Sequence, residues 1–389
     1  MHKNINFNQV IQRRNTGSIK WDVYAEDVIP LWIADMDFAS PPEIMEALHR
    51  RVDHGIFGYG NPSPALPDLL IDWMKAEYEW RVERDWIVWL PGLVTGLNLF
   101  CRAFSGQSEE VIVQTPVYPP LHLAPAANHL RPAYSPLVQD DAGKYLMDFA
   151  DLRSKMERGA RTMILCNPHN PVGRVFTRDE LQQLAALCLE YDALLCSDEI
   201  HCDLLLNGNR HTPVASLSPE VADCTITLMA PSKTFNIAGL GCSVAIVPNQ
   251  QLRQELQRAS WGIVPHVNIL GFTAAEAAYQ YGKPWLEEAL RTLEDNHSVL
   301  LAFVKEKLPG IRIHPVEGTY LAWLDCRSLG LENPQQFFLE KCRVALNDGA
   351  DFGEPGKGFV RLNFACPQTI LIQALSKMET GLRENGYIP

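Results

Sequence analysis

The sequence lacks the features that mark several common classes of protein. None of its ten cysteines forms a C-x-x-C pair and no H-E-x-x-H motif occurs, so neither a zinc site nor a redox motif is indicated. The chain has 34 Lys and Arg against 46 Asp and Glu, a net charge of −12, and so has no excess of the cations that neutralise nucleic-acid phosphates. We expect no nucleic-acid partner, whereas the net charge does not exclude the binding of an anionic small ligand.

Long hydrophobic runs are also absent. The longest apolar stretch without Asp, Glu, Lys or Arg, from Val111 to Leu130, contains four prolines and cannot form a spanning helix. The first fifteen residues have neither the apolar core of a signal peptide nor the composition of a transit peptide. Because the cysteines also occur singly, we expect a cytoplasmic protein in a reducing compartment with no membrane contact.

Short apolar runs of strand length fill the middle of the chain. Helical patterns lie between them, and the clearest begins at Thr177, where T-R-D-E predicts a capping box with Glu180. Strands that alternate with helices, and that are apolar throughout, predict an open α/β sheet buried on both faces. The predicted strands are Trp86–Leu90, Val111–Gln114, Thr162–Cys166, Ala193–Ser197, Thr225–Met229 and Ser243–Val247.

The last hundred residues have a different pattern. A long amphipathic stretch from Trp285 to Lys307 precedes alternating runs at Gly318–Leu324 and Gly358–Asn363, which predicts a smaller α+β domain. The length of 389 residues corresponds to about two to three domains. We predict a large domain over residues 45–283 and a small one formed by residues 1–44 and 284–389.

Polar and glycine-rich segments follow four of the predicted strands. Trp86–Leu90 leads into P-G-L-V-T-G, Thr162–Cys166 into N-P-H-N-P, Ala193–Ser197 into Asp198-Glu199, and Thr225–Met229 into A-P-S-K, which ends at Lys233. Ligands of open α/β sheets bind outside the carboxyl ends of the strands. A glycine-bounded helix start suits a phosphate, a lysine amine can bind a carbonyl compound covalently, and a carboxylate can keep a pyridine nitrogen protonated. Together these groups predict a pyridoxal-phosphate site.

Each feature taken singly has a simpler explanation. Lys233 alone would be read as a solvated surface lysine, Asp198 as a turn or helix-cap residue, and N-P-H-N-P as a turn fixed by proline. His201 is either a partner of the Asp198 carboxylate or a structural histidine. Two candidate nucleotide-binding motifs do not match. The segment that begins at Gly239 has Val244 where the dinucleotide fingerprint G-x-G-x-x-G requires its third glycine, and the residues around Gly356 and Lys357 do not form a P-loop. The coincidence of all four features at equivalent strand ends favours the cofactor site.

At these residues the chain resembles the fold-type I pyridoxal-phosphate enzymes, and within them the MalY/PatB-type cystathionine β-lyases, or C–S lyases. The shared strings span nearly the whole chain. They are W-I-A-D-M-D-F at 32–38, F-G-Y-G at 57–60, T-P-V-Y at 115–118, N-P-H-N-P-V-G at 167–173, S-D-E-I-H at 197–201, P-S-K-T-F-N-I-A-G-L at 231–240 and V-R-L-N-F-A at 360–365. The resemblance implies a large domain with a mostly parallel seven-stranded sheet flanked by helices, and a smaller α+β domain.

The resemblance also implies which residues bind the cofactor. Lys233 would hold pyridoxal 5′-phosphate covalently, Asp198 would pair with its ring nitrogen, and Asn170 would bind its phenolic oxygen. The remaining residues implied in cofactor binding are Tyr118, stacked on the ring, Val94, Thr95 and Ser232 at the phosphate, His201 beside Asp198, and Tyr59, reaching the phosphate in the neighbouring subunit.

The implied substrate is a sulfur-containing amino acid. Arg361 would bind its α-carboxylate with a bidentate pair, with Asn170 and Tyr118 also at the substrate. Lys233 would take the Cα proton, and either Lys233 or Tyr118 would protonate the leaving sulfur. A site shared through Tyr59 implies an obligate homodimer.

The implied reaction is β-elimination of L-cystathionine, L-cysteine or related thioethers to a thiol or sulfide, pyruvate and ammonia. An aminotransferase on the same scaffold is the nearest alternative. Many such enzymes carry a phosphate-binding arginine eight residues after the lysine, where this chain has Gly241, which agrees with the lyases. A regulatory protein that binds a transcription factor is a second alternative, although no motif marks such a surface.

Overall fold

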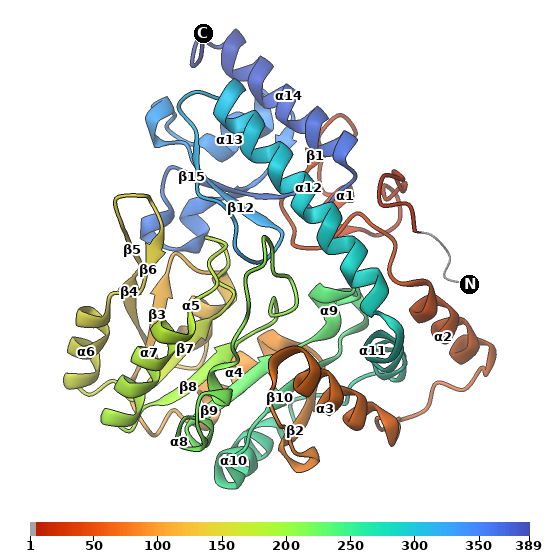
Figure 1. The fold of residues 1–389 in the computed structure, drawn as a ribbon, viewed down its shortest axis with the longest axis vertical. Helices are drawn as coiled ribbons and strands as arrows, with labels where there is room; N and C mark the ends of the chain where they lie inside the picture. The colour runs from red at the N-terminus through yellow and green to blue at the C-terminus, as the bar shows by residue number, and fades with distance from the viewer. Residues whose placement is uncertain (1–4) are drawn as a thin grey trace.

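A computed structural model describes residues 5–389 and contains the expected α/β sheet (Figure 1). Six of its seven strands run in one direction, and only β10 is antiparallel to its neighbours β2 and β9. The architecture is therefore the mostly parallel seven-stranded sheet that the resemblance implied. In spatial order the strands are β2 (Ile87–Leu90), β10 (Ser243–Ile246), β9 (Thr225–Met229), β8 (Leu194–Asp198), β7 (Thr162–Cys166), β3 (Glu110–Thr115) and β4 (Arg131–Pro136).

The central strands are buried because successive side chains enter two different cores. Val111 and Val113 of β3 pack in the core under helices α4 and α10, whereas Ile112 packs in the core under α6 and α7. This two-sided burial explains the continuous apolar runs in the sequence. The helices around the sheet are α2 (Pro42–Asp53), α3 (Ala65–Tyr78), α4 (Leu93–Ala103), α5 (Pro119–Ala127), α6 (Phe149–Glu157), α7 (Arg178–Glu190), α8 (Pro219–Asp223), α9 (Pro231–Thr234), α10 (Gln250–Ser260) and α11 (Ile269–Tyr281).

Several predicted element bounds need correction. Trp86 ends a short 3-10 helix before β2, Ala193 precedes β8, and Val247 follows β10. The edge strand β4 was not predicted at all. The capping box is present, because the Thr177 hydroxyl accepts from the Glu180 N–H while the Glu180 carboxylate accepts from the Thr177 N–H.

A second, antiparallel sheet lies beside the first and is covered by long helices near the C-terminus (Figure 1). The predicted run from Gly318 begins as a strand only at Leu321. The strands of this second sheet are, in spatial order, β11 (Arg312–Ile313), β12 (Leu321–Asp325), β15 (Phe359–Asn363) and β14 (Asn347–Asp348). The helices of this part of the chain are α12 (Lys283–Lys307), α13 (Pro334–Glu340) and α14 (Gln368–Glu384). A short hairpin, β5 (Val138–Gln139) and β6 (Tyr145–Leu146), extends from the first sheet's side.

The N-terminal segment joins this second sheet. After α1 (Ile19–Asp22), strand β1 (Ile29–Pro30) pairs in parallel with β13 (Val344–Ala345), and the Asn363 N–H donates to the Leu31 carbonyl. The two ends of the chain thus pack together, which supports a small domain built from residues 1–44 and 284–389. That division stays a prediction, and its first four residues lie outside the described part. Within residues 5–389, no helix combines the length and apolarity needed to cross a bilayer.

Candidate active site

A cavity of about 430 Å³ opens at the carboxyl ends of the parallel strands, between the seven-stranded sheet and the N-terminal segment. All of the predicted site residues except Thr95 and Tyr59 line it. The predicted residues that line the cavity are Val94, Tyr118, Asn170, Asp198, His201, Ser232, Lys233 and Arg361. The convergence follows from topology, because parallel strands bring their carboxyl ends to one edge of the sheet.

Lys233 lies in α9 directly after β9 and is half-buried. Its Nζ donates to the carbonyl oxygen of Ala34 at 2.5 Å. Burial, and then the nearby positive charge of Arg361, lowers the pKa of Lys233 to about 8. An amine with this pKa is partly neutral near neutral pH, as a nucleophile or a base must be.

Asp198 ends β8 and is 4% exposed. Burial raises its pKa to about 7, an effect that the hydrogen bond from the Ile200 N–H to Oδ1 partly opposes. Such a carboxyl group gains most by accepting a hydrogen bond from a cationic N–H, which restores its charged form. Asp198 is therefore placed to bind a protonated ring nitrogen.

Arg361 lies on β15 of the second sheet, yet its guanidinium enters the same cavity. NH1 donates to Asn170 Oδ1 at 3.0 Å, while NH2 donates to the Trp32 carbonyl at 2.8 Å and to Asn347 Oδ1 at 2.6 Å. Its buried Nε has no hydrogen-bond partner, and burial lowers the pKa of Arg361 to about 10. A fixed cation with a donor to spare is suited to binding a carboxylate.

Tyr118 and His201 complete the wall around these groups. The Tyr118 N–H donates to the Asn170 carbonyl at 3.0 Å, and burial raises the pKa of its phenol. His201 is buried, and its Nδ1 has no hydrogen-bond partner. Burial and the charge of Lys233 lower the pKa of His201, so its ring is neutral. Its ring packs edge-on against Tyr320, and no hydrogen bond joins it to Asp198 among the described contacts.

Two of the predicted site residues do not line the cavity of the single chain. Thr95 is in the first turn of α4 but does not line the cavity, although Gly92, Leu93 and Val94 of the same helix start do. Tyr59 is fully exposed at 103%. Sequence reasoning missed Trp32 and Asn347, which both accept from Arg361.

The donor set fits pyridoxal phosphate. The N-terminus of α4 begins at Gly92 and opens on the cavity, so that its unpaired N–H groups and the Ser232 hydroxyl suit a phosphate. Buried Nδ1 of His201 and Nε of Arg361, both without a partner, are the kind of polar atoms that a bound group satisfies. With Lys233 and Asp198 in place, this chemistry matches an aldehyde, a phosphate and a pyridine nitrogen.

Comparison with known proteins agrees with this chemistry. The family model described as aminotransferase class I and II matches residues 26–377. Cystathionine β-lyase PatB of Bacillus subtilis is 41% identical over 97% of this chain and 100% of its own length. The crystal structure of OvoB is similar with a TM-score of 0.93, at 42% identity over 97% of this chain and 99% of that one. Cystalysin from Treponema denticola, which contains pyridoxal 5′-phosphate, gives a TM-score of 0.95 at 33% identity, over 98% of this chain and 100% of that one.

Proposed function

The chain belongs to the class I and II aminotransferase family, and from its similarity to cystathionine β-lyases we infer that it is a pyridoxal-phosphate-dependent enzyme that cleaves carbon–sulfur bonds by β-elimination. The observation that carries this inference is the meeting of Lys233, Asp198 and Arg361 in one buried cavity. We propose amino acids with a sulfur at Cβ, such as L-cystathionine and L-cysteine, as substrates, and pyruvate, ammonia and a thiol or sulfide as products.

Each residue has a defined task in this reaction. Lys233, Asp198, Asn170, Tyr118, His201, Ser232 and the start of α4 would hold the cofactor. When bound, pyridoxal phosphate supplies the electron sink for the negative charge that forms at the substrate's Cα. Arg361 orients the substrate carboxylate, and the Lys233 amine, with its lowered pKa, removes the Cα proton. Lys233 or Tyr118 then gives a proton to the sulfur that leaves Cβ.

Incubation of the purified holoenzyme with L-cystathionine, and separately with L-cysteine, tests the reaction. We expect pyruvate in both cases, with a free thiol from the first and sulfide from the second, and no 2-oxo acid needs to be added as an amino-group acceptor. Pyruvate from neither substrate, together with amino-group transfer when a 2-oxo acid is added, would instead support an aminotransferase. Gly241, in place of an arginine, favours the lyase.

Arg361→Ala should weaken substrate binding while leaving the cofactor bound. The guanidinium is the buried cation at the cavity wall, and loss of one partner of a buried charge pair costs about 2–5 kcal/mol, so KM should rise at least about 30-fold. Steady-state kinetics and the visible absorption of the cofactor measure the two effects separately.

Arg343→Ala is the matched control, since this half-buried arginine lies outside the cavity and its side chain pairs with Asp27. Arg361→Ala with an unchanged KM, or with loss of the cofactor instead, would show that Arg361 is misplaced in this scheme.

We propose that the working unit is a homodimer with shared sites. The support is the segment 56–59, in which Ile56, Phe57 and Tyr59 are all exposed although they are apolar or aromatic. Tyr59 would reach the phosphate of the partner's cofactor. Sedimentation should give twice the chain mass, and Tyr59→Ala should lower cofactor affinity while the dimer persists. A monomeric active enzyme would refute the shared site.

A further inference from the structure

Arg174 is a buried cation that the proposed cofactor and substrate contacts do not use. It directly follows the N-P-H-N-P-V-G string that carries Asn170, and it is 1% exposed. A buried charge is costly unless it is paired and hydrogen-bonded. Arg174 does not line the active-site cavity, so its partners must come from the chain itself and not from a ligand bound there.

The three nitrogens of the Arg174 guanidinium donate to different parts of the chain. Nε donates to the Tyr145 carbonyl of the β5–β6 hairpin at 2.7 Å. NH2 donates to both carboxylate oxygens of Glu180 in the first turn of α7, at 2.7 and 2.8 Å. NH1 donates to the Val175 carbonyl at 3.1 Å and to Oε2 of Glu317, which lies between β11 and β12. The planar fork of an arginine can join three elements in this way, whereas a lysine amine cannot.

Glu317 is the contact on the side of the second sheet. Its Oε2 also accepts from the Val175 N–H at 2.9 Å, its Oε1 pairs with Lys144 of the hairpin loop at 3.1 Å, and its own N–H donates to the Gly173 carbonyl at 2.8 Å. Burial would raise the pKa of Glu317, but the Val175 N–H and the charges of Arg174 and Lys144 outweigh burial and hold this pKa below its ordinary value. Glu317 is therefore charged and forms a true ion pair with Arg174.

Arg174 also closes the turn of residues 167–173, which we call the Asn170 turn. The Arg174 carbonyl accepts from the His169 N–H at 2.7 Å, so that the residue after the turn is bonded across its base. Within the turn, Asn170 Oδ1 accepts from NH1 of Arg361, which belongs to the second sheet, at 3.0 Å. The Asn170 turn thus meets the second sheet twice, inside the active-site cavity through Asn170 and outside it through Arg174.

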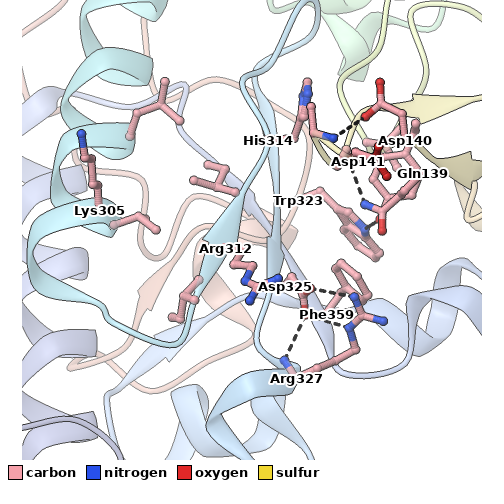
Figure 2. Close-up of a pocket in the computed structure, with 18 residues that line it drawn as sticks. Gln139, Asp140, Asp141, Lys305, Arg312, His314, Trp323, Asp325, Arg327 and Phe359 are labelled. Carbon is pink, nitrogen blue, oxygen red and sulfur yellow. Dashed lines mark hydrogen bonds and ion pairs between the residues drawn. The ribbon is translucent and has the colours of Figure 1, made fainter.

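Close packing does not fix the whole of this arrangement. A cavity of about 640 Å³ lies between the β5–β6 hairpin and strands β11 and β12 of the second sheet, and Val172 of the Asn170 turn also lines it. Figure 2 shows Gln139 and Asp140 of the hairpin together at one side of this cavity. Because these surfaces are not packed against each other throughout, the spacing between the turn and the second sheet depends on directed contacts such as those of Arg174 and Glu317.

We propose that Arg174 is a positioning residue of the substrate site and that it acts through its ion pair with Glu317. The pair sets the spacing between the Asn170 turn and the second sheet, so that Asn170 Oδ1 keeps the Arg361 guanidinium in the orientation that binds the substrate's α-carboxylate. A misplacement of about 1 Å in such a contact strongly lowers the efficiency of a site. The inference rests on the proposed function in one respect, the role of Arg361 as the carboxylate-binding residue.

Spectral titration of the holoenzyme with two amines tests this role. L-Alanine carries the α-carboxylate but has no leaving group at Cβ, and ethylamine is the same molecule without the carboxylate. Both change the visible absorption of the cofactor when they bind. Glu317→Gln should raise the Kd of L-alanine at least about threefold and that of ethylamine less than about 1.5-fold. Equal rises for the two amines, or an unchanged Kd for L-alanine, would overturn the proposal.

A double-mutant cycle tests whether the effect passes through the ion pair. Arg174→Lys keeps the charge but loses the planar fork, and it should also raise the Kd of L-alanine. Because both substitutions break the same contact, Glu317→Gln should add less than about 1.5-fold in the Arg174→Lys background. Full additivity of the two effects overturns the coupling. These conservative variants replace Arg174→Ala, which would leave Glu180 and Glu317 without their buried cation.

Asp151→Asn is the matched control for Glu317→Gln. Asp151 forms a partly buried ion pair with Lys155 on α6 and lines neither cavity. Its substitution should leave both Kd values within about 1.5-fold of wild type, and an equal loss of L-alanine affinity there would overturn the assignment. Neither titration needs elimination, so a failed lyase assay is a separate result. A wild type that binds L-alanine no more tightly than ethylamine would refute the role of Arg361, and this inference with it.

Discussion

Lys233→Ala is expected to abolish turnover and the visible absorption of the lysine-bound cofactor. The substitution removes the only amine that lines the cavity within the described residues, and with it both the covalent attachment and the base. Loss of a positioned base alone costs about 10²–10⁴-fold in rate, so we expect a fall in kcat of at least about 10³-fold. Pyruvate release and an absorption spectrum measure the two losses.

Two controls make the Lys233→Ala result specific. Lys377→Ala removes a half-buried lysine outside the cavity, whose Nζ donates to the Asp27 carbonyl, and it should leave both signals unchanged. A small primary amine such as ethylamine should restore part of the activity of Lys233→Ala, because it can enter the space left by the deleted side chain. Full turnover in Lys233→Ala without added amine would disprove the assignment.

Asp198→Asn should retain the cofactor on Lys233 but lose most of the rate. An amide has nearly the same shape as the carboxylate, yet it cannot stabilise a proton on the ring nitrogen by charge. Removal of one such preorganised electrostatic contact from a buried site costs about 10²–10³-fold in kcat. The ratio of kcat values at saturating substrate, with bound cofactor measured by absorption, gives the effect.

Asp192→Asn is the matched control for Asp198→Asn, because it makes the same change of charge at another position. Asp192 lies between α7 and β8 and does not line the cavity. Its substitution should therefore leave kcat unaltered. A kcat within about twofold of wild type in Asp198→Asn would mean that another group holds the ring proton.

The central strands could be predicted from sequence because burial on both faces leaves an unbroken apolar run, as in Thr162–Cys166. Strand β4 has no such signal. Its sequence R-P-A-Y-S-P contains two prolines and an exposed arginine and tyrosine, which an edge strand tolerates because only one of its sides pairs. Only its pairing with β3, a tertiary contact, makes it a strand.

Some residues of the candidate site could likewise be predicted from the sequence, and others could not. Lys233, Asp198 and Asn170 could be placed together because each lies at or just after the carboxyl end of a parallel strand, and sheet topology then determines their meeting. Arg361 was placed by family resemblance alone, since it lies on a separate sheet. Asn347 was missed, because its role depends on pairing between β14 and β15, in which Asn347 lies opposite Arg361. Nothing in the local sequence marks that register.

The resting position of Lys233 depends on the main chain and not on a side chain. The carbonyl oxygen of Ala34 accepts from Lys233 Nζ and also from the Tyr320 hydroxyl, at 2.5 and 2.9 Å. Every amino acid carries this oxygen, so a saturation mutational scan should report position 34 as tolerant of small residues despite its direct contact with the lysine. The acceptor can be weakened only by editing the backbone itself, for example with an ester in place of the amide that follows Ala34.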